Sequence, residues 1–376
     1  MSAQHQQQTP LSIELQAYLK AKNVKQQELA DLLNVDVRTL RRWLSGQTII
    51  ADVRELKRVA DILQVAPERL GVTSSLYIPL TPEQIDDATQ HAWKHIRAGK
   101  YYEANTLVDK LIIDIASFTQ STDTVLLRRL ANAHYVAGFV KSQVSRMNEV
   151  NAAIFHYHEM EQIARMLGDH NLMNISLTYQ GDMLQRRGNV IEAITYLEAA
   201  RDTTPQADIS AKGNSVQLLG RAYFKARRLG DFEKAIKESE DLALELEETT
   251  SGRATKGQYN AGTVYEEYGR SLGLLGQTKE GMDYLDRAEQ EFKRTWVTQR
   301  RDLLLTSSRA MVLVHGGEIR EGVNKAVECI ELVKKSGNVR MMDRIYGIQQ
   351  YIDRLSHEIG SAGIILREAL TGPVEY

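Results

Sequence analysis

Apolar residues recur at helical spacing along nearly the whole chain, and the long C-terminal part shows no β-like alternation. From residue 83 onward, amphipathic segments follow one another and are separated by turns that contain Gly or Asn. The stretch 73–82, TSSLYIPLTP, carries Ser/Thr and two prolines between helical patterns and is typical of a linker. The pattern therefore predicts an all-α chain with a small domain at 11–72 and a long helical domain after the linker.

The segment 25–46, KQQELADLLNVDVRTLRRWLSG, divides into two short helices. Asn34 stands at the turn between them, where asparagine tolerates a left-handed backbone. Asp36 is placed to cap the second helix and Gly46 to end it. The small Ala30 allows the two helices to approach closely where they cross. This spacing predicts a compact helical bundle whose second helix also carries several arginines.

Residues 11–72 resemble the lambda-repressor/Cro-like (XRE-type) family of helix-turn-helix domains. The residues that carry the resemblance are Gln26, Glu28, Leu29, Ala30, Val35, Thr39, Leu40, Arg42, Trp43 and Gly46. Asn34 departs from the glycine usual in the family, but it fits the same left-handed turn. The resemblance implies that the second helix enters the major groove of double-stranded DNA.

Three arginines, Arg38, Arg41 and Arg42, lie on the outward face of this helix. Arginine can donate two hydrogen bonds to guanine, so we expect Arg38 and Arg42 to read bases and Arg41 to meet a phosphate. The resemblance assigns Gln26 to a backbone phosphate. The expected DNA-contacting set is completed by Val37 and Thr39. The alternative is that the arginines merely solvate a helix face.

The long C-terminal domain contains an internal repeat. The segments 179–205 and 267–292 align by Gly181 with Gly269, Gly188 with Gly276, Ala193 with Gly281, Leu197 with Leu285, and Ala200 with Ala288. The turn glycine and the small residue five positions later recur as Gly99/Ala104, Gly230/Ala235 and Gly317/Gly322, and more weakly as Asn148/Ala153. Small residues at these places let paired helices pack closely, which is typical of helical repeats.

This signal resembles tetratricopeptide repeats. Combined with the N-terminal resemblance, it is similar to the Gram-positive peptide-sensing (RRNPP-type) regulators. The fold expected is a helix-turn-helix bundle followed by a right-handed α-solenoid of about six repeats over 83–335. Capping helices are expected over 336–376, because a repeat array must cover its last apolar face. Residues 1–10 are expected to form a disordered arm.

A ligand groove is expected on the first helices of the repeats. Asparagine side chains can pair with both the N–H and the C=O of an extended peptide. Asn132, Asn214 and Asn260 each lie 21 residues before the small residue of their repeat, and Arg301 takes that place in the last one. Further candidates are Asn174, Arg221, Glu267 and Arg270. The alternative is that these asparagines cap helices, since they lie near predicted helix starts.

Composition excludes several classes of protein. The net charge of −2 divides into +2 over residues 11–72 and −4 elsewhere. Cys329 is the single cysteine, and no Cys/His cluster predicts a metal. No phosphate-binding loop or nucleophile motif appears, so neither an enzyme nor a cofactor is expected. No apolar run is long enough to span a membrane and the N-terminus lacks signal-peptide features, which favours the cytoplasm.

These patterns predict a DNA-binding transcriptional regulator that acts as a homodimer and whose repeats bind an effector, with a short peptide as the expected ligand. The alternative is a protein-interaction scaffold whose repeats bind a partner protein, such as a response regulator or an antirepressor.

Overall fold

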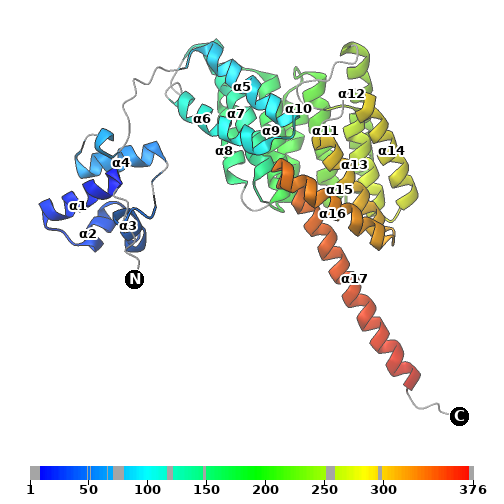
Figure 1. Cartoon of the computed structure of the whole chain (residues 1–376). Coiled ribbons are helices and arrows are strands. Elements are labelled where there is room, and N and C mark those ends of the chain that lie inside the picture. The colour runs from blue at the N-terminus through cyan, green and yellow to red at the C-terminus, as the bar shows by residue number, and fades with distance from the viewer. Residues whose placement is uncertain are drawn as a thin grey trace. The chain divides into compact units, whose positions relative to one another are not determined.

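The computed structural model describes residues 9–48, 50, 52–65, 67–70, 80–116, 122–146, 150–250, 259–294 and 299–371. All regular structure in these ranges is helical, as the apolar spacing predicts. The chain divides into two compact units, Met1–Ile78 and Pro79–Tyr376. Each unit is built around its own helices (Figure 1).

The N-terminal unit is a small helical bundle with one apolar core. Its core includes Leu29, Ala30, Leu40 and Trp43, none of them more than 6% exposed. The predicted pair of short helices is present. The elements are α1 (Pro10–Lys22), α2 (Gln26–Leu32), α3 (Val37–Leu44), α4 (Val53–Leu63) and the 3-10 turn η1 (Pro67–Leu70).

Local signals in the sequence position these helices. Asn34 has a φ of 53° and Gly46 a φ of 71°, so both adopt the left-handed backbone predicted for them. The Asp36 carboxylate accepts a hydrogen bond from the Thr39 backbone N–H at 2.8 Å and caps α3. The turn between α2 and α3 therefore forms as the sequence predicts.

The beginning of α1 corrects the prediction of a disordered arm over 1–10. Thr9 is the N-cap and forms a capping box with Ser12, and Pro10 is the first helical residue. Proline suits this position because its φ is already helical and its missing N–H would have no helical partner. Thr9 and Pro10 thus belong to the bundle, and residues 1–8 lie outside the described residues.

The C-terminal unit consists, in its described residues, of six antiparallel helix pairs and one long final helix. The first helix of each pair contacts the first helix of the next pair. The pairs are α5 (Pro82–Arg97) with α6 (Tyr101–Ile115), α7 (Thr124–Val144) with α8 (Asn151–Leu167), α9 (His170–Arg186) with α10 (Val190–Thr203), α11 (Ile209–Lys225) with α12 (Leu229–Thr250), α13 (Ala261–Leu274) with α14 (Thr278–Arg294), and α15 (Gln299–His315) with α16 (Ile319–Ser336).

Glycines hold the helices of a pair close together. A Cβ on Gly181 would come within 2.7 Å of the Leu197 side chain, and one on Gly269 within 2.7 Å of the backbone of Gly281. The turn glycines Gly188 and Gly276 have φ values of 86° and 85°. The repeat alignment between 179–205 and 267–292 is therefore confirmed by equivalent packing and equivalent turns.

The fourth pair corrects one turn. Gly230 was expected at the turn between α11 and α12, but it lies inside α12, which begins at Leu229. Arg227 takes the left-handed conformation instead, with a φ of 62°. Its neighbours close the turn because the Arg228 N–H donates to the Tyr223 carbonyl at 2.9 Å. The repeat register in this pair is thus three residues earlier than the glycine pattern predicts.

The C-terminal capping helices expected over 336–376 are one continuous helix in the described residues. This helix, α17 (Arg340–Thr371), packs its first turns on α15 and α16 and also contacts α7. Its later turns project away from the array (Figure 1). Gly360 lies within the helix, because a single glycine costs only about 1 kcal/mol in a helix interior. No helix in the described part of the chain is long and apolar enough to cross a membrane.

Candidate functional site

The exposed face of α3 carries the predicted DNA-contacting arginines. Arg38, Arg41 and Arg42 are all solvent-exposed. Arg41 Nε donates a hydrogen bond to Gln26 Oε1 at 3.3 Å, so the first residue of α2 and the middle of α3 form one polar surface. A pair of helices with this geometry can set α3 against a groove while Gln26 and Arg41 meet the backbone of the nucleic acid.

Two further residues of the predicted DNA set have structural roles as well. The Thr39 hydroxyl donates to the Asp36 carboxylate at 2.8 Å. Hydrogen bonds from the Thr39 side chain and backbone lower the pKa of Asp36 and keep the cap ionised. Val37 is half-buried against the core of the bundle. Thr39 and Val37 therefore help to fix the start of α3, while the arginines are its open groups.

In the repeat unit, one position of every first helix lines a cavity. This position directly follows the small residue that packs on the second helix: Gly181 precedes Asp182, Gly220 precedes Arg221, and Gly269 precedes Arg270. The residues at this position, from the first pair to the sixth, are Trp93, Phe139, Asp182, Arg221, Arg270 and Met311. We call them the groove position.

The central cavity draws on five consecutive first helices and on α17. It leaves about 90 Å³ of space and is lined by α7, α9, α11, α13 and α15, with α17 as a further wall. Its polar lining includes Gln143, Asn214, Gln217, Asp182, Arg221, Glu266, Arg301, Arg340 and Arg344. A site of this composition can bind a polar or charged group, but in this conformation it has no room for a peptide of several residues.

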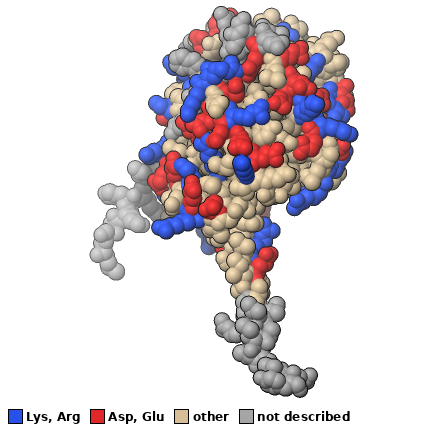
Figure 2. All heavy atoms as spheres, turned by 90° about the vertical axis from the view of Figure 1, so that its right-hand side faces the viewer, with Lys and Arg blue, Asp and Glu red and all other residues tan. Residues whose placement is uncertain are grey.

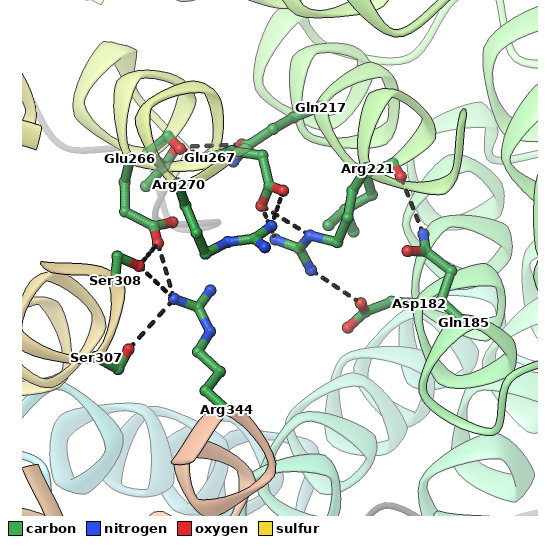
Figure 3. A network of polar contacts seen from close by, with 12 residues as sticks. Asp182, Gln185, Gln217, Arg221, Glu266, Glu267, Arg270, Ser307, Ser308 and Arg344 are labelled. Carbon is green, nitrogen blue, oxygen red and sulfur yellow. Dashed lines mark hydrogen bonds and ion pairs between the residues drawn. The ribbon is translucent and has the colours of Figure 1, made fainter. Parts of the chain in front are cut away.

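Ion pairs connect the first helices across this cavity. Arg221 bridges Asp182 at 3.3 Å and Glu267 at 2.6 Å, and Arg270 pairs with the same Glu267. Burial alone would raise the pKa of Glu267, but the guanidinium groups of Arg221 and Arg270 outweigh burial and lower it. Figure 3 shows the guanidinium groups of Arg221, Arg270 and Arg344 pointing toward one another.

The beginning of α17 ties together repeats that are not neighbours in sequence. Arg340 pairs with Asp182 of α9 at 2.8 Å, and Asp343 pairs with Arg186 of the same helix at 2.9 Å. Arg344 donates to Glu266 of α13 at 2.8 Å, and its hydrogen bonds to Ser307 and Ser308 of α15 are drawn in Figure 3. The final helix is therefore part of the site as well as the end of the array.

The structure divides the predicted asparagine ladder. Asn214 lines the central cavity, and Asn132 lines a separate cavity beside Trp93 on α5 and α7. Asn260 is the N-cap of α13 and accepts a hydrogen bond from the Thr263 backbone N–H at 3.1 Å. Asn174 is fully buried and donates to the Ala200 carbonyl at 2.9 Å, so it joins α9 to α10. Asn260 and Asn174 thus have structural partners in place of open positions on the cavity.

The ladder divides because the predicted register of the repeats is wrong in places. Asn132 and Asn214 lie seven residues before the groove position of their helices, which is two helical turns and the same face. Asn260 and Arg301 lie ten residues before it, at the helix start. Arg301 still lines the central cavity, and its guanidinium lies over the Phe292 ring at 4.8 Å.

Among the other predicted groove residues, Arg221 lines the central cavity and also a second cavity that adjoins it. Arg270 lines the adjoining cavity. Glu267 is fully buried and pairs with both arginines. The sequence reasoning missed Asp182, Glu266, Arg340 and Arg344. Asp182 could have been found, because it follows Gly181 as Arg221 follows Gly220. The α17 residues carry no repeat signal, and only the tertiary structure brings them to the site.

Comparison with known proteins agrees with the geometry of the N-terminal unit. Residues 15–70 match the helix-turn-helix family. The chain is a helix-turn-helix DNA-binding regulator. The match covers α2, α3 and α4, and it includes the exposed arginines of α3. The family is one of DNA-binding domains and not of enzymes, as the sequence predicts.

Two solved structures resemble the chain distantly. One is the Bacillus thuringiensis PlcR in complex with the peptide PapR7 and DNA, with 11% identity, a TM-score of 0.41, and coverage of 76% of this chain and 95% of that one. The other is ComR from S. thermophilus in complex with DNA and its signalling peptide ComS, with 14% identity, a TM-score of 0.35, and coverage of 81% and 99%. No curated protein sequence matches the chain.

Proposed function

We propose that this helix-turn-helix regulator is switched by an effector that binds between the first helices of its repeats. The observation that carries the proposal is the central cavity, to which five first helices and α17 all contribute polar side chains. A ligand that contacted several of these helices would stabilise one spacing of the array over another. A short peptide is the effector we favour, provided that α17 yields its place in the groove.

The DNA-contacting residues proposed for this function are those on the open face of α2 and α3. Arg38 and Arg42 would donate to base edges, and Gln26 and Arg41 would meet phosphates. We expect the active form to be a homodimer, because one bundle of this size offers too little contact for tight specific binding. A change in the repeat array would then alter the distance between two DNA-reading helices.

Unpartnered amides support binding of a ligand with peptide-like groups. Asn214 makes no side-chain hydrogen bond to the described part of the chain and faces the central cavity. Gln143 Oε1 is buried at the same cavity and also has no partner among the described residues. A buried acceptor without a partner costs about 1–3 kcal/mol, which a ligand N–H would recover.

The test begins with selection of a preferred DNA sequence from a random pool by the full chain. DNA affinity is then measured by fluorescence anisotropy with and without peptide fractions of spent culture medium. A fraction that changes the affinity of the native chain, but not that of an Asn214→Ala variant with unchanged melting, supports the proposal. DNA affinity that responds to no fraction contradicts it.

A protein partner is the second candidate. Three large apolar side chains on α17, namely Tyr346, Ile359 and Ile364, are each more than half exposed. A partner protein that packed on α17 could cover these side chains. If a partner protein binds α17 and the central cavity stays unchanged, the result would favour this scaffold function over the effector-binding function.

A further inference from the structure

We propose that a second cavity, between α9, α11, α13 and α17, binds an oxyanion, either a carboxylate or a phosphate group. The proposal rests on the proposed function and names the chemistry of the effector. The cavity adjoins the central one and leaves about 240 Å³ of space. A single water needs roughly 10–15 Å³ of such space, so a carboxylate or phosphate group fits together with solvent.

The lining of this oxyanion cavity has an excess of positive charge. Six cations and two carboxylates surround it, and two further carboxylates, Glu266 and Glu267, pair with the same cations. The net charge is therefore +2 in a confined space. The cations are Arg186, Arg221, Lys225, Arg270, Arg340 and Arg344, and the lining carboxylates are Asp182 and Asp343.

Two buried donors at this cavity have no partner. Arg186 Nε and Arg270 Nε make no hydrogen bond among the described residues, although both side chains are almost fully buried. Each guanidinium uses another nitrogen for its carboxylate, so Nε is the donor left without a partner among the described residues. Guanidinium donors that converge on one space are the groups proteins use to hold carboxylates and phosphates.

Lys225 is the cation of this cavity that the protein binds most weakly. Its Nζ makes one long hydrogen bond, 3.4 Å, to the Gln185 carbonyl, and its side chain remains accessible from the mouth of the cavity. The surrounding protein and then the charge of Arg221 lower the pKa of Lys225 to about 8. Burial and neighbouring arginines lower the pKa of Arg186 and Arg270 as well. The positive charges of these side chains repel one another, and a bound anion would reduce that repulsion.

One outer face of the repeat unit does not share this imbalance. Figure 2 shows Lys/Arg and Asp/Glu side chains interspersed over the face of the repeat unit that it presents. A ligand with a negative group would therefore find no comparable basic patch on that face. At the oxyanion cavity the ligand would contact Arg340 and Arg344, which belong to α17. Its binding would therefore affect the contacts that hold α17 against the repeats.

The experiment uses inorganic phosphate as the first probe. Melting of the repeat unit in the full chain is followed at pH 7 while phosphate replaces chloride at constant ionic strength. We expect a saturable rise in melting temperature. Triglycine and triglycine amide, which differ in the terminal carboxylate, form the second arm. A rise with triglycine and none with its amide identifies a peptide carboxylate as a ligand, and a rise with phosphate alone identifies a phosphate group.

Two variants complete the test. Lys225→Met removes one cation without leaving a carboxylate unpaired, so it should raise the melting temperature in chloride and reduce the phosphate-induced rise at least twofold. Lys237→Met, on the exposed side of α12, is the matched control and should change neither value. Equal melting in phosphate, chloride and triglycine overturns the proposal, as does an unchanged response in Lys225→Met. Since no DNA is present, failure here leaves effector-controlled DNA binding to be judged by its own assay.

Discussion

The arginines of α3 and those of the repeat array have opposite environments. The Arg38 and Arg42 side chains are exposed and make no hydrogen bond to the described part of the chain. Arg221 and Arg270 lie inside the array and share the buried carboxylate of Glu267. One residue type thus serves two purposes. Exposure leaves a guanidinium free for an external anion such as DNA, whereas burial requires an internal carboxylate and makes the side chain part of the fold.

The largest effect is expected from a substitution that breaks buried ion pairs. Arg221→Met should lower the free energy of unfolding of the repeat unit by about 3–5 kcal/mol, because Asp182 and Glu267 would both lose a buried partner. Calorimetry of the full chain should show an earlier repeat transition. Arg38→Met is the control and should leave both transitions in place. If Arg221→Met melts like the native chain, the buried network contributes nothing to the fold.

Acidification offers a second test of buried groups. His134 Nδ1 lies 3.2 Å from His156 Nδ1 between α7 and α8, and burial lowers the pKa of these histidines to about 4 and about 3. Since both pKa values lie below 6.5, the fold favours the neutral rings. Their contribution is complete above pH 6.5 and falls as the pH drops toward 4, by on the order of 3 kcal/mol for each ring.

The measurement compares the native chain with the His134→Gln/His156→Gln double variant. Urea unfolding midpoints at pH 7 and pH 4.5 should fall further for the native chain than for the variant. The carboxylates of the central network also lose stability in acid, and the difference between the two chains removes that shared part. Equal losses would mean that the two rings accept protons in the folded state without penalty.

Substitution of the exposed arginines should affect DNA alone. Arg38→Ala or Arg42→Ala should weaken binding to the selected DNA by about 1–3 kcal/mol and relax the preference at one base position. Arg41→Ala should weaken specific and non-specific DNA alike and lower the salt dependence by about one counterion. Anisotropy titrations at several salt concentrations separate the two outcomes. Native affinity in all three variants would disprove the assignment of α3 as the reading helix.

The smallest expected effect separates the two kinds of asparagine. Asn260→Ala should lower the stability of the repeat unit by about 1 kcal/mol, because α13 would lose its N-cap. Asn214→Ala should leave stability nearly unchanged, since its amide has no partner in the described chain. Thermal melting of both variants is sufficient. A larger loss in Asn214→Ala than in Asn260→Ala would reverse the roles assigned here.

Much of the fold could be predicted from the sequence because its signals are local. Asn34 and Gly46 adopt the left-handed backbone because their side chains permit it, and Gly181 and Gly269 recur because helix pairs must approach closely. The exposure of the α3 arginines followed from the same reasoning, since an exposed helix face depends only on helical spacing. Their contact with DNA is what the family resemblance implies. Arg227 was missed because a turn can force a larger residue into a conformation that glycine usually takes.

The sequence by itself determined the all-α class, the helix-turn-helix and the paired-helix repeats, since capping, turns and apolar spacing act within a few residues. Only the tertiary structure decided which polar groups meet. Arg344 reaches Glu266 across 78 residues of chain, and Arg340 reaches Asp182 from a helix that carries no repeat signal. Ion pairs of this kind form where the array brings distant helices together, and no local pattern records the partner.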